Sequence, residues 1–356
     1  MSKKKISIIT IHSIYNYGSA LQSYATQCFL EKLGYDAELI DYRPDYDKTF
    51  IRKIKNCGIK LLFPKTYFIR ARKYFKFHKN NMNLSKRKYK NYKELCNNPP
   101  KADIYLSGSD QIWNTYFPCG KDRAYTLEFI KNEKKIANSS SIGRDDMSID
   151  DLKQLAERIK DYKWISMREK SGVRQLAKVG VEAVDVCDPV FLLSADYYKK
   201  IQVKPNIGKY ILVYSVHQSP DLSEIVQLIK KKLGLNVVLV GDIPIKCYHD
   251  ISKKDSGPLE FIGLINGAEY IITNSFHCVA FSLILQKQFL PVAPKVNASR
   301  VTNILEIGKI QDILVETVKD LPEKLINIDY EKVSFYINEY AKQSAEKLKN
   351  ALMSIE

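Results

Sequence analysis

The chain has 356 residues, 45% of them hydrophobic, and a formal net charge of +16. This length exceeds one compact domain of ordinary size, so two domains are expected, and no window approaches the roughly 18 uninterrupted apolar residues of a membrane span. The seven cysteines are scattered without a C-x-x-C pair, which argues against a disulfide framework or a structural zinc site and indicates a reducing cytosol.

The N-terminal part of the chain has the pattern of a strand, a turn, a helix and a second strand. The strand is expected at residues 5–11 and a polar turn at 13–19. A helix over 20–33 ends at Gly34, and the next strand covers 37–42. This order favours a parallel α/β sheet.

Residues 51–93 are strongly basic, with fifteen Lys or Arg, no Asp or Glu, and interleaved aromatic residues. Because the whole chain carries +16, the remainder is nearly neutral at +1. Such a segment suits an anionic membrane surface or a lipid-linked substrate, and it also suits single-stranded nucleic acid. The segment is expected to be an insertion over about 46–98 in the N-terminal domain. The alternative to a binding role is a solvated helical insertion whose aromatic residues pack onto their own domain.

The next elements continue the alternation of strands and helices. Strands are expected at 103–106, 135–138, 164–167 and 183–187, with an amphipathic helix at 149–162. After a break at 204–208, a second set of strands is expected at 210–216, 237–240, 270–273 and 289–292, with helices at 221–233, 259–266 and 276–285. The predicted organisation is an N-terminal domain over 1–204, a C-terminal domain over 205–328 and an amphipathic helix over 329–356.

A strand followed by a helix around His277 is the most informative segment. The apolar run 270–272 is followed by Thr273, Asn274 and Ser275, and a nearly all-apolar helix then begins with His277 in its first turn. The unpaired N–H groups of a helix N-terminus favour a phosphate or carboxylate, and an imidazole there can move a proton. The alternative is a packed histidine at a helix start.

Polar clusters follow several of the predicted strands. They are Asn16-Tyr17-Gly18-Ser19, Ser107-Gly108-Ser109-Asp110, Ser139-Ser140-Ser141, Arg168-Glu169, and Ser275 with His277. Ligands of open parallel sheets bind outside the carboxyl ends of the strands, although any one cluster could be a cap or a turn. Asp110 could deprotonate a hydroxyl or form an Asx turn, and Arg168 or Arg300 could bind a phosphate or lie on the surface. The other histidines have no partners at ligand spacing, so no metal site is expected.

Several motifs, in this order, resemble those of the polysaccharide pyruvyl transferases, from the N-terminus to about Gly308. The motifs are Asn16-Tyr17-Gly18-Ser19-Ala20-Leu21-Gln22, Asp41-Tyr42-Arg43-Pro44, Ser107-Gly108-Ser109-Asp110-Gln111-Ile112-Trp113-Asn114, Arg168-Glu169-Lys170-Ser171-Gly172, Asp188-Pro189, Thr273-Asn274-Ser275-Phe276-His277 and Ser299-Arg300. Two positions depart from the family pattern. Glycine commonly replaces Cys278, and arginine commonly replaces Ser275, so a donor-binding arginine must come from elsewhere, with Arg168 or Arg300 favoured.

The resemblance implies a fold of two Rossmann-like domains with parallel sheets facing a cleft, as in GT-B glycosyltransferases. It implies transfer of pyruvate from phosphoenolpyruvate to two sugar hydroxyls, with formation of a cyclic ketal, release of phosphate, and no cofactor or metal. In this scheme His277 is the candidate acid, Asp110 the candidate base, and Arg168 a catalytic cation. The expected substrate-binding residues, in or beside the clusters and motifs, are Asn16, Tyr17, Gly18, Ser19, Gln22, Arg43, Ser107, Gly108, Ser109, Trp113, Asn114, Ser139, Ser141, Asn274, Ser275 and Arg300.

The same resemblance implies a function for the basic segment. Bacterial surface sugars are commonly built on a polyprenyl diphosphate at the inner membrane face. We therefore expect a lipid-linked saccharide acceptor, contact of 51–93 with an anionic membrane, no nucleic-acid partner, and a cytoplasmic enzyme peripherally associated with the plasma membrane. Two other functions remain open. One is a GT-B-type glycosyltransferase that uses a nucleotide sugar, and the other is a non-catalytic protein that binds lipid or nucleic acid.

Overall fold

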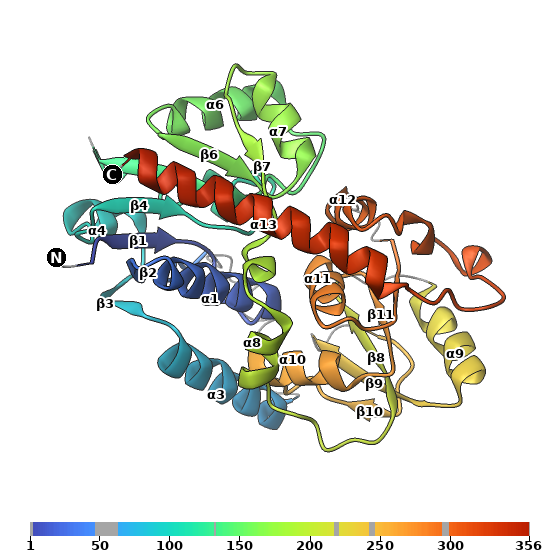
Figure 1. Cartoon of the computed structure of the whole chain (residues 1–356). Coiled ribbons are helices and arrows are strands. Elements are labelled where there is room, and N and C mark those ends of the chain that lie inside the picture. Colours follow the sequence, from blue (N-terminus) through green and yellow to red (C-terminus); the bar gives the residue numbers. More distant parts are fainter. Residues whose placement is uncertain are drawn as a thin grey trace. The chain divides into compact units, whose positions relative to one another are not determined.

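The computed structural model describes residues 3–46, 63–131, 133–216, 221–241, 246–293 and 299–355. The chain forms two compact units (Figure 1). Unit 1 comprises Met1–Pro64, His78–Leu192 and Tyr340–Glu356, and unit 2 comprises Lys65–Phe77 and Leu193–Glu339. The predicted boundary at 204/205 falls inside unit 2, just after helix α8 (Ala195–Ile201). Helices α3 (Pro64–Asn81) and α13 (Tyr330–Ile355) each contribute residues to both units.

Unit 1 is built on a seven-stranded sheet in the order β3-β2-β1-β4-β5-β6-β7, and each neighbouring pair is parallel. Its strands are β1 (Lys5–Ile9), β2 (Asp36–Tyr42), β3 (Leu84–Tyr89), β4 (Ile104–Ser107), β5 (Lys134–Ser140), β6 (Trp164–Met167) and β7 (Val184–Asp185). The central strand β1 places Ile6 opposite Ala37 on one side and Ile104 on the other. The order 3-2-1-4-5-6 is that of Rossmann domains, whose switch point lies between the first and fourth strands.

The helices of unit 1 connect these strands in the right order for a parallel sheet. They are α1 (Tyr17–Lys32), α4 (Tyr92–Asn97), α5 (Pro118–Lys121), α6 (Ile149–Ile159) and α7 (Lys170–Ala177), with a 3₁₀ turn at Pro189–Leu192. Helix α6 shows why they form where they do. Ser148 caps its N-terminus by accepting a hydrogen bond from the Asp151 N–H at 3.1 Å, and its buried stripe includes Leu152 and Ile159.

Unit 2 has a five-stranded parallel sheet in the order β10-β9-β8-β11-β12, which repeats the same 3-2-1-4-5 pattern. Its strands are β8 (Tyr210–Ser215), β9 (Asn236–Gly241), β10 (Ile251–Ser252), β11 (Tyr270–Thr273) and β12 (Phe289–Pro291). Its further helices are α9 (Leu222–Leu233), α10 (Pro258–Gly267), α11 (Phe276–Ile284) and α12 (Ser299–Ile307), with 3₁₀ turns at Gln311–Ile313 and Val318–Asp320.

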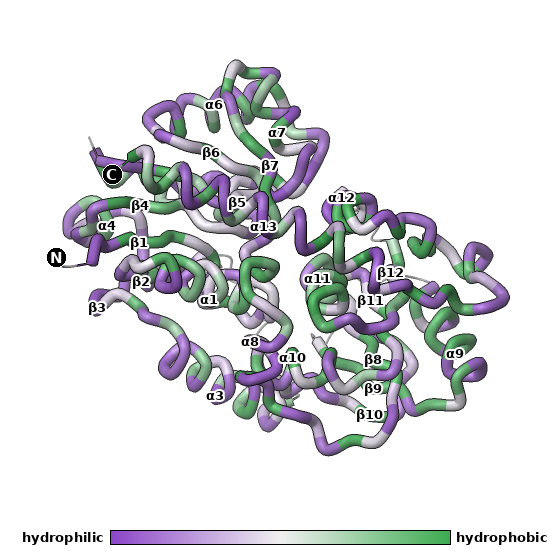
Figure 2. The backbone as a smooth tube through the Cα atoms, in the orientation of Figure 1, coloured by the Kyte–Doolittle hydropathy of each residue, from purple (hydrophilic) through white to green (hydrophobic). Residues whose placement is uncertain are grey.

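Each unit has its own hydrophobic core. The central strands β1, β8 and β11 are hydrophobic along most of their length (Figure 2). This pattern is expected for parallel strands, which are buried on both faces. The core of unit 1 includes Trp113 and Met167, whereas that of unit 2 includes Ile229 and Ile272. Two Rossmann-like units with parallel sheets and a C-terminal helix confirm the predicted fold class.

The basic segment is part of this fold where the structure describes it. Residues 47–62 lie outside the described residues, and with them the first part of 51–93. Strand β3 belongs to the main sheet and pairs with β2, so the predicted insertion includes a structural strand. The exposed Lys86, Arg87 and Lys88 lie on this edge strand, where charged side chains hinder pairing with another chain. Among the described residues, no helix combines the length and the hydropathy that a membrane crossing requires.

Candidate active site

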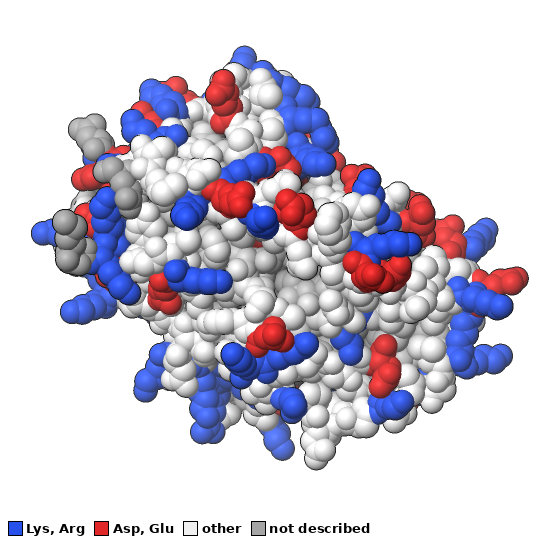
Figure 3. Space-filling view, viewed as in Figure 1, with Lys and Arg blue, Asp and Glu red and all other residues white. Residues whose placement is uncertain are grey.

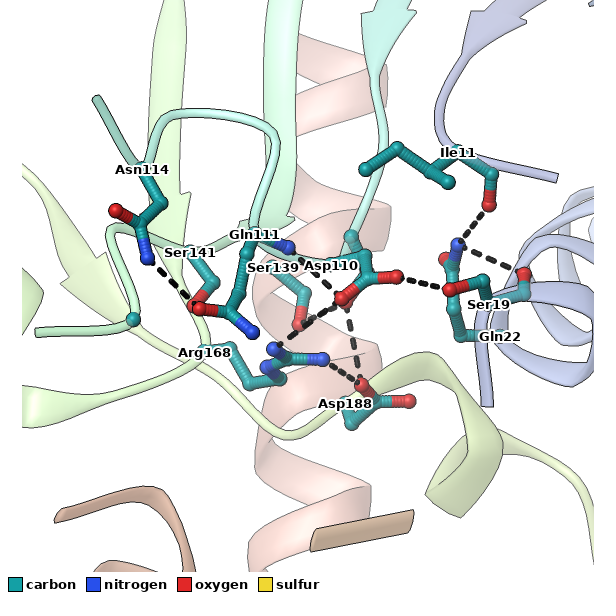
Figure 4. Close-up of polar contacts among 12 residues, drawn as sticks. Ile11, Ser19, Gln22, Asp110, Gln111, Asn114, Ser139, Ser141, Arg168 and Asp188 are labelled. Atoms are coloured by element: carbon teal, nitrogen blue, oxygen red, sulfur yellow. Dashed lines mark hydrogen bonds and ion pairs between the residues drawn. The ribbon is translucent and has the colours of Figure 1, made fainter. Parts of the chain in front are cut away.

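The polar clusters of unit 1 lie at the carboxyl ends of neighbouring strands. Strands β1, β4, β5 and β6 are adjacent in the sheet, and each is parallel to the next. The segments that follow them carry Ser19, Asp110, Ser141 and Arg168, so the sheet gathers four of the predicted clusters at one edge (Figure 4). This edge is where open α/β sheets bind ligands.

Asp110 is held in an unusual backbone conformation at the centre of this edge. Its φ of 76° lies in the left-handed region, which Asp enters more readily than most residues. Its Oδ2 accepts a hydrogen bond from the Ser19 hydroxyl at 2.5 Å, and its Oδ1 accepts one from the Gln111 N–H at 2.8 Å. These contacts fix the carboxylate in one orientation. A carboxylate oxygen has a further acceptor position, so an additional hydroxyl can still approach it.

Arg168 is enclosed by carboxylates. Its guanidinium donates to Asp188 at 2.7 Å and lies 3.8 Å from Asp110 and 3.9 Å from Glu169. Burial opposes its charge, but Asp188, Asp110 and Glu169 more than offset this effect and hold the pKa of Arg168 above its ordinary value. Three carboxylates around one guanidinium leave a formal charge of −2. The structure thus shows Arg168 as a buried cation paired with acidic side chains.

Glu169 organises the loop that follows β5. Its Oε1 accepts hydrogen bonds from the Ser141 hydroxyl at 2.9 Å, the Ile142 N–H at 2.9 Å and the Gly143 N–H at 3.1 Å. Gly143 has a φ of +71°, and a Cβ there would lie 2.2 Å from Oε1 of Gln111. Glycine suits this position, because another residue would be strained at this φ and would displace the Gln111 side chain. Glu169 was part of a predicted cluster but had no individual role, because its partners are distant in the sequence.

The start of helix α1 carries Ser19, which contacts Asp110. Asn16 caps the helix, with its side chain accepting from the Ser19 N–H at 3.1 Å. The helix begins at Tyr17, so the predicted turn is shorter than 13–19 because the cap starts the helix earlier. Gln22 donates to the Thr10 hydroxyl at 2.9 Å and to the Ile11 carbonyl at 3.2 Å. Tyr17, Gly18 and Gln22 are all buried in the first part of this helix.

Several of the predicted binding residues are packed in the core. Trp113 is fully buried and donates to the Tyr125 carbonyl at 3.2 Å. The Ser107 hydroxyl also donates to that carbonyl, at 2.9 Å, and a Cβ on Gly108 would lie 2.9 Å from Cβ of Thr10. We assign these three residues to packing below the site.

Three predicted residues lie closer to Asp110. Ser109 donates to Asp188 at 3.2 Å, Ser139 donates to the Cys187 carbonyl at 2.9 Å, and Asn114 donates to Gln111 at 2.8 Å. Ser139 also has a positive φ of 58°, where β5 bends away from its ladder with β6. Their contacts align the loops around Asp110, which is a supporting role for the predicted binding site.

A second polar cluster lies at the carboxyl ends of β1 and β2, where two histidines that the sequence did not indicate join the predicted motif of Asp41 and Arg43. His12 contacts Asp41 at 3.2 Å, and Arg43 donates to the same carboxylate oxygen at 2.5 Å. Burial alone would raise the pKa of Asp41, but the hydrogen bonds from His12 and Arg43 more than offset it and lower that pKa. His78 contacts the His12 carbonyl at 3.0 Å. Arg43, a predicted binding residue, is therefore tied to Asp41.

The His78 side chain makes the stability of unit 1 depend on pH. Burial, aided by the charges of His12 and Arg43, lowers the pKa of His78 from 6.5 to about 4. The unfolded chain binds this proton first as the pH falls, so stability present above pH 6.5 is lost between 6.5 and about 4. We expect the unfolding free energy to fall by up to about 1.4 kcal/mol per pH unit in that window. Urea unfolding at several pH values should show this slope reduced in His78→Gln, and an identical slope in both proteins would contradict it.

In unit 2, His277 lies in the first turn of α11, as predicted. Ser275 is the N-cap and accepts from the Cys278 N–H at 3.5 Å, while Asn274 accepts from the Val216 N–H at 2.9 Å. The His277 side chain is 8% exposed and its ring centroid lies 5.2 Å from that of Phe276. The predicted binding residues Asn274 and Ser275 thus shape the strand-to-helix turn that carries His277.

The structure also shows where Arg300 lies, and where Cys278 and Ser275, the two positions that depart from the family pattern, lie. Cys278 is fully buried in unit 2, and burial raises the pKa of its thiol to about 12, so it is a small packed side chain. Ser275 supplies the helix cap in place of an arginine. Arg300 is half-buried near the start of α12. Within the described part of the chain, no group of three or more His, Cys, Asp or Glu is arranged to hold a metal ion.

The structure thus brings Asp110, Arg168 and Ser19 together in unit 1, and places His277 and Arg300 in unit 2.

Comparison with solved structures identifies proteins that share this fold. The S. aureus MnaA–UDP complex is 13% identical, with a TM-score of 0.56 over 98% of this chain and 96% of that chain. A UDP-GlcNAc 2-epimerase from Neisseria meningitidis bound to UDP-GlcNAc is 11% identical, with a TM-score of 0.53 over 99% and 100%. A glycosyltransferase from Rickettsia africae is 12% identical, with a TM-score of 0.51 over 99% and 94%.

Sequence comparison gives the family. No curated protein matches the chain. A sequence model of the family described as polysaccharide pyruvyl transferase matches residues 16–295, which is most of the chain and includes every strand of both sheets after β1. The matched region contains Asp110, Arg168 and His277. The chain therefore belongs to the polysaccharide pyruvyl transferase family.

Proposed function

We propose that this transferase moves pyruvate from phosphoenolpyruvate onto two hydroxyls of one sugar in a saccharide acceptor, forming a cyclic ketal. The enol CH₂ carbon of the donor gains a proton and becomes a methyl group, while the first hydroxyl oxygen bonds to the carbon that carries the phosphate. The second hydroxyl oxygen then displaces inorganic phosphate from that carbon. The observation that best supports this reaction is the orientation of Asp110 at the sheet edge in a chain of this family.

The residues can be given roles in this reaction. His277 is the proposed acid that protonates the enol carbon, because a first-turn position on α11 adjoins N–H groups that favour an anionic donor. Arg300 on α12 is the proposed donor-binding arginine, since its guanidinium can form paired hydrogen bonds with a phosphate or carboxylate. Asp110 is the proposed base for an acceptor hydroxyl, and Ser19 orients its carboxylate. The scheme uses no cofactor and no metal.

The proposed acceptor is a saccharide of a bacterial capsule or exopolysaccharide precursor, carried on a polyprenyl diphosphate. The basic segment supports this choice, because cations interleaved with aromatic residues suit a diphosphate at a lipid surface. The enzyme would then be a peripheral protein at the inner face of the plasma membrane.

A nucleotide-sugar glycosyltransferase is the second candidate function. It is favoured by the structural similarity to proteins that were solved with UDP or UDP-GlcNAc. These neighbours are less than 25% identical, so they show the fold of this chain and leave its donor to experiment.

Release of phosphate from phosphoenolpyruvate distinguishes the proposed pyruvyltransferase from a nucleotide-sugar glycosyltransferase. We expect the enzyme to release phosphate from phosphoenolpyruvate when a lipid-linked sugar acceptor is present, and the product to gain pyruvate by mass spectrometry. Asp110→Asn keeps the shape of the side chain and tolerates its positive φ, so it should fold and lose this activity by about 10²–10⁴-fold. Release of UDP from a nucleotide sugar, with no phosphate from phosphoenolpyruvate across a panel of acceptors, would favour the glycosyltransferase.

A further inference from the structure

Helix α3 is anchored to unit 2 by one of its faces. Lys73 lies 3.8 Å from Asp255 and 3.5 Å from Glu260, the third residue of α10. A Cβ on Gly257 would lie 2.7 Å from Cβ of Lys73, which shows how closely the helix approaches that turn. Tyr74 is 1% exposed on the same side of α3. This side of the helix is therefore fixed by burial and by ion pairs.

The opposite side of α3 is exposed and has an unusual composition. Phe68 is 70% exposed and Phe75 is 65% exposed. Among the residues of α3 that belong to unit 2, exposed cations lie between and beside them, at Lys65, Arg72 and Lys76. At 3.6 residues per turn these five side chains fall within an arc of about 100° on the helix surface. We call these five residues the outer α3 face.

The outer α3 face combines apolar surface with positive charge and no negative charge. Helix α3 contains no Asp or Glu, and Lys and Arg side chains project from the surface over it (Figure 3). A single exposed phenylalanine needs no explanation, but two on one arc, flanked by three cations, form an amphipathic surface. Lipid-binding helices place aromatic residues at the acyl boundary and Lys or Arg at the head groups.

We propose that the outer α3 face docks on an anionic lipid bilayer, with Phe68 and Phe75 in the acyl boundary and the three cations at the lipid head groups. The two rings are separated by seven residues, about 10 Å along the helix axis. Both protrude from a convex helix, whereas single-stranded nucleic acid is usually bound in a groove lined by stacking rings. The proposal rests on the proposed lipid-linked acceptor for its purpose, because docking would bring the enzyme to that substrate.

Vesicle binding tests this proposal without any substrate. The full chain is mixed with vesicles of phosphatidylcholine alone or with phosphatidylglycerol added, and the bound fraction is measured by co-sedimentation. The charge variant is Lys65→Gln/Arg72→Gln/Lys76→Gln, and the apolar variant is Phe68→Ser/Phe75→Ser. Far-UV circular dichroism and urea unfolding confirm that both variants fold.

The chain offers a matched control for each variant. Phe335 on α13 is 66% exposed, so Phe335→Ser removes a comparably exposed ring from another helix. The exposed Lys200, Lys204 and Lys231 lie elsewhere in unit 2, so replacing these three with Gln removes the same charge. A general effect of net charge would therefore change the charge control as much as the charge variant, and a general effect of hydrophobicity would change Phe335→Ser about half as much as the double apolar variant.

We expect the wild-type chain to bind the phosphatidylglycerol vesicles. Removing three cations should weaken this binding by about 100-fold, at about fivefold per charge, and the apolar variant should also lose at least about tenfold. Both controls should bind like the wild type. Undiminished binding in the two variants, equal losses in the controls, or a loss of dimerisation or oligonucleotide binding in place of vesicle binding would overturn the proposal.

A second assay separates membrane docking from the proposed reaction. It measures phosphate release from phosphoenolpyruvate with a water-soluble acceptor, which requires no membrane. Variants that lose vesicle binding but keep this activity would support docking as a distinct property of α3. A wild-type chain that binds vesicles but releases no phosphate from phosphoenolpyruvate would instead overturn the proposed function and leave the docking surface standing.

Discussion

His277→Gln is expected to lower kcat for phosphate release by about 10²–10⁴-fold, the usual contribution of a general acid. The physical reason is that glutamine cannot transfer a proton to the enol carbon. Glutamine still donates and accepts hydrogen bonds at the start of α11, where Ser275 caps the helix independently of His277. Stability should therefore change little, and KM for phosphoenolpyruvate should change less than kcat.

His249→Gln is the matched control for this substitution. His249 is also in unit 2, but it is exposed and contacts the Cys247 carbonyl at 2.8 Å. Its replacement should leave kcat unchanged. Steady-state kinetics of both variants, with urea unfolding alongside, give the comparison. A loss below about tenfold in His277→Gln would move the acid role to another residue, and equal losses in both variants would point to a general effect on unit 2.

The strands could be predicted from the sequence because buried parallel strands are short apolar runs. All ten predicted strands are present, and β6 and β11 have the predicted bounds. Strand β3 could not be predicted in this way, because its Leu-Ser-Lys-Arg-Lys-Tyr sequence has three consecutive cations. It forms a strand because β2 offers its free edge, and because an edge strand tolerates exposed charge.

The sequence predicted the position of each site residue within its strand or helix. It did not predict contacts between residues that are distant in the sequence. The strand-end position of Asp110 followed from the alternation of elements, and so did His277 in the first turn of a helix. The contacts between Ser19 and Asp110, which are 91 residues apart, and between His12 and Asp41, 29 apart, depend on strand order. Strand order follows from tertiary packing, so spacing in the sequence did not identify His12 as part of a polar cluster.

The contacts of Arg168 in the structure also change the choice between the two candidate arginines. The sequence favoured Arg168 or Arg300 for the donor. Phosphoenolpyruvate carries a phosphate and a carboxylate, so its binding arginine must have guanidinium N–H groups that the donor can reach. The Arg168 side chain is 1% exposed and already pairs with Asp188, whose side chain is fully buried. We therefore propose that Arg300 binds the donor and that Arg168 acts through the carboxylates around it.

Arg168→Met should destabilise unit 1 by about 3–5 kcal/mol, because it leaves the buried Asp188 carboxylate without its cation. Arg300→Met should leave stability nearly unchanged and raise KM for phosphoenolpyruvate by about 10- to 100-fold, the range for lost hydrogen bonds to a charged group. Urea unfolding and phosphate-release kinetics on both variants separate the two roles.

A double substitution tests whether the Arg168 effect comes from the ion pair. Adding Asp188→Asn to Arg168→Met removes the uncompensated charge, so the double variant should recover part of the lost stability. The introduced amide would keep an oxygen acceptor for the Val190 N–H, which the Asp188 carboxylate now binds at 3.1 Å. If Arg168→Met instead keeps wild-type stability and raises KM for phosphoenolpyruvate, the donor contacts Arg168, and the assignment of the donor to Arg300 is wrong.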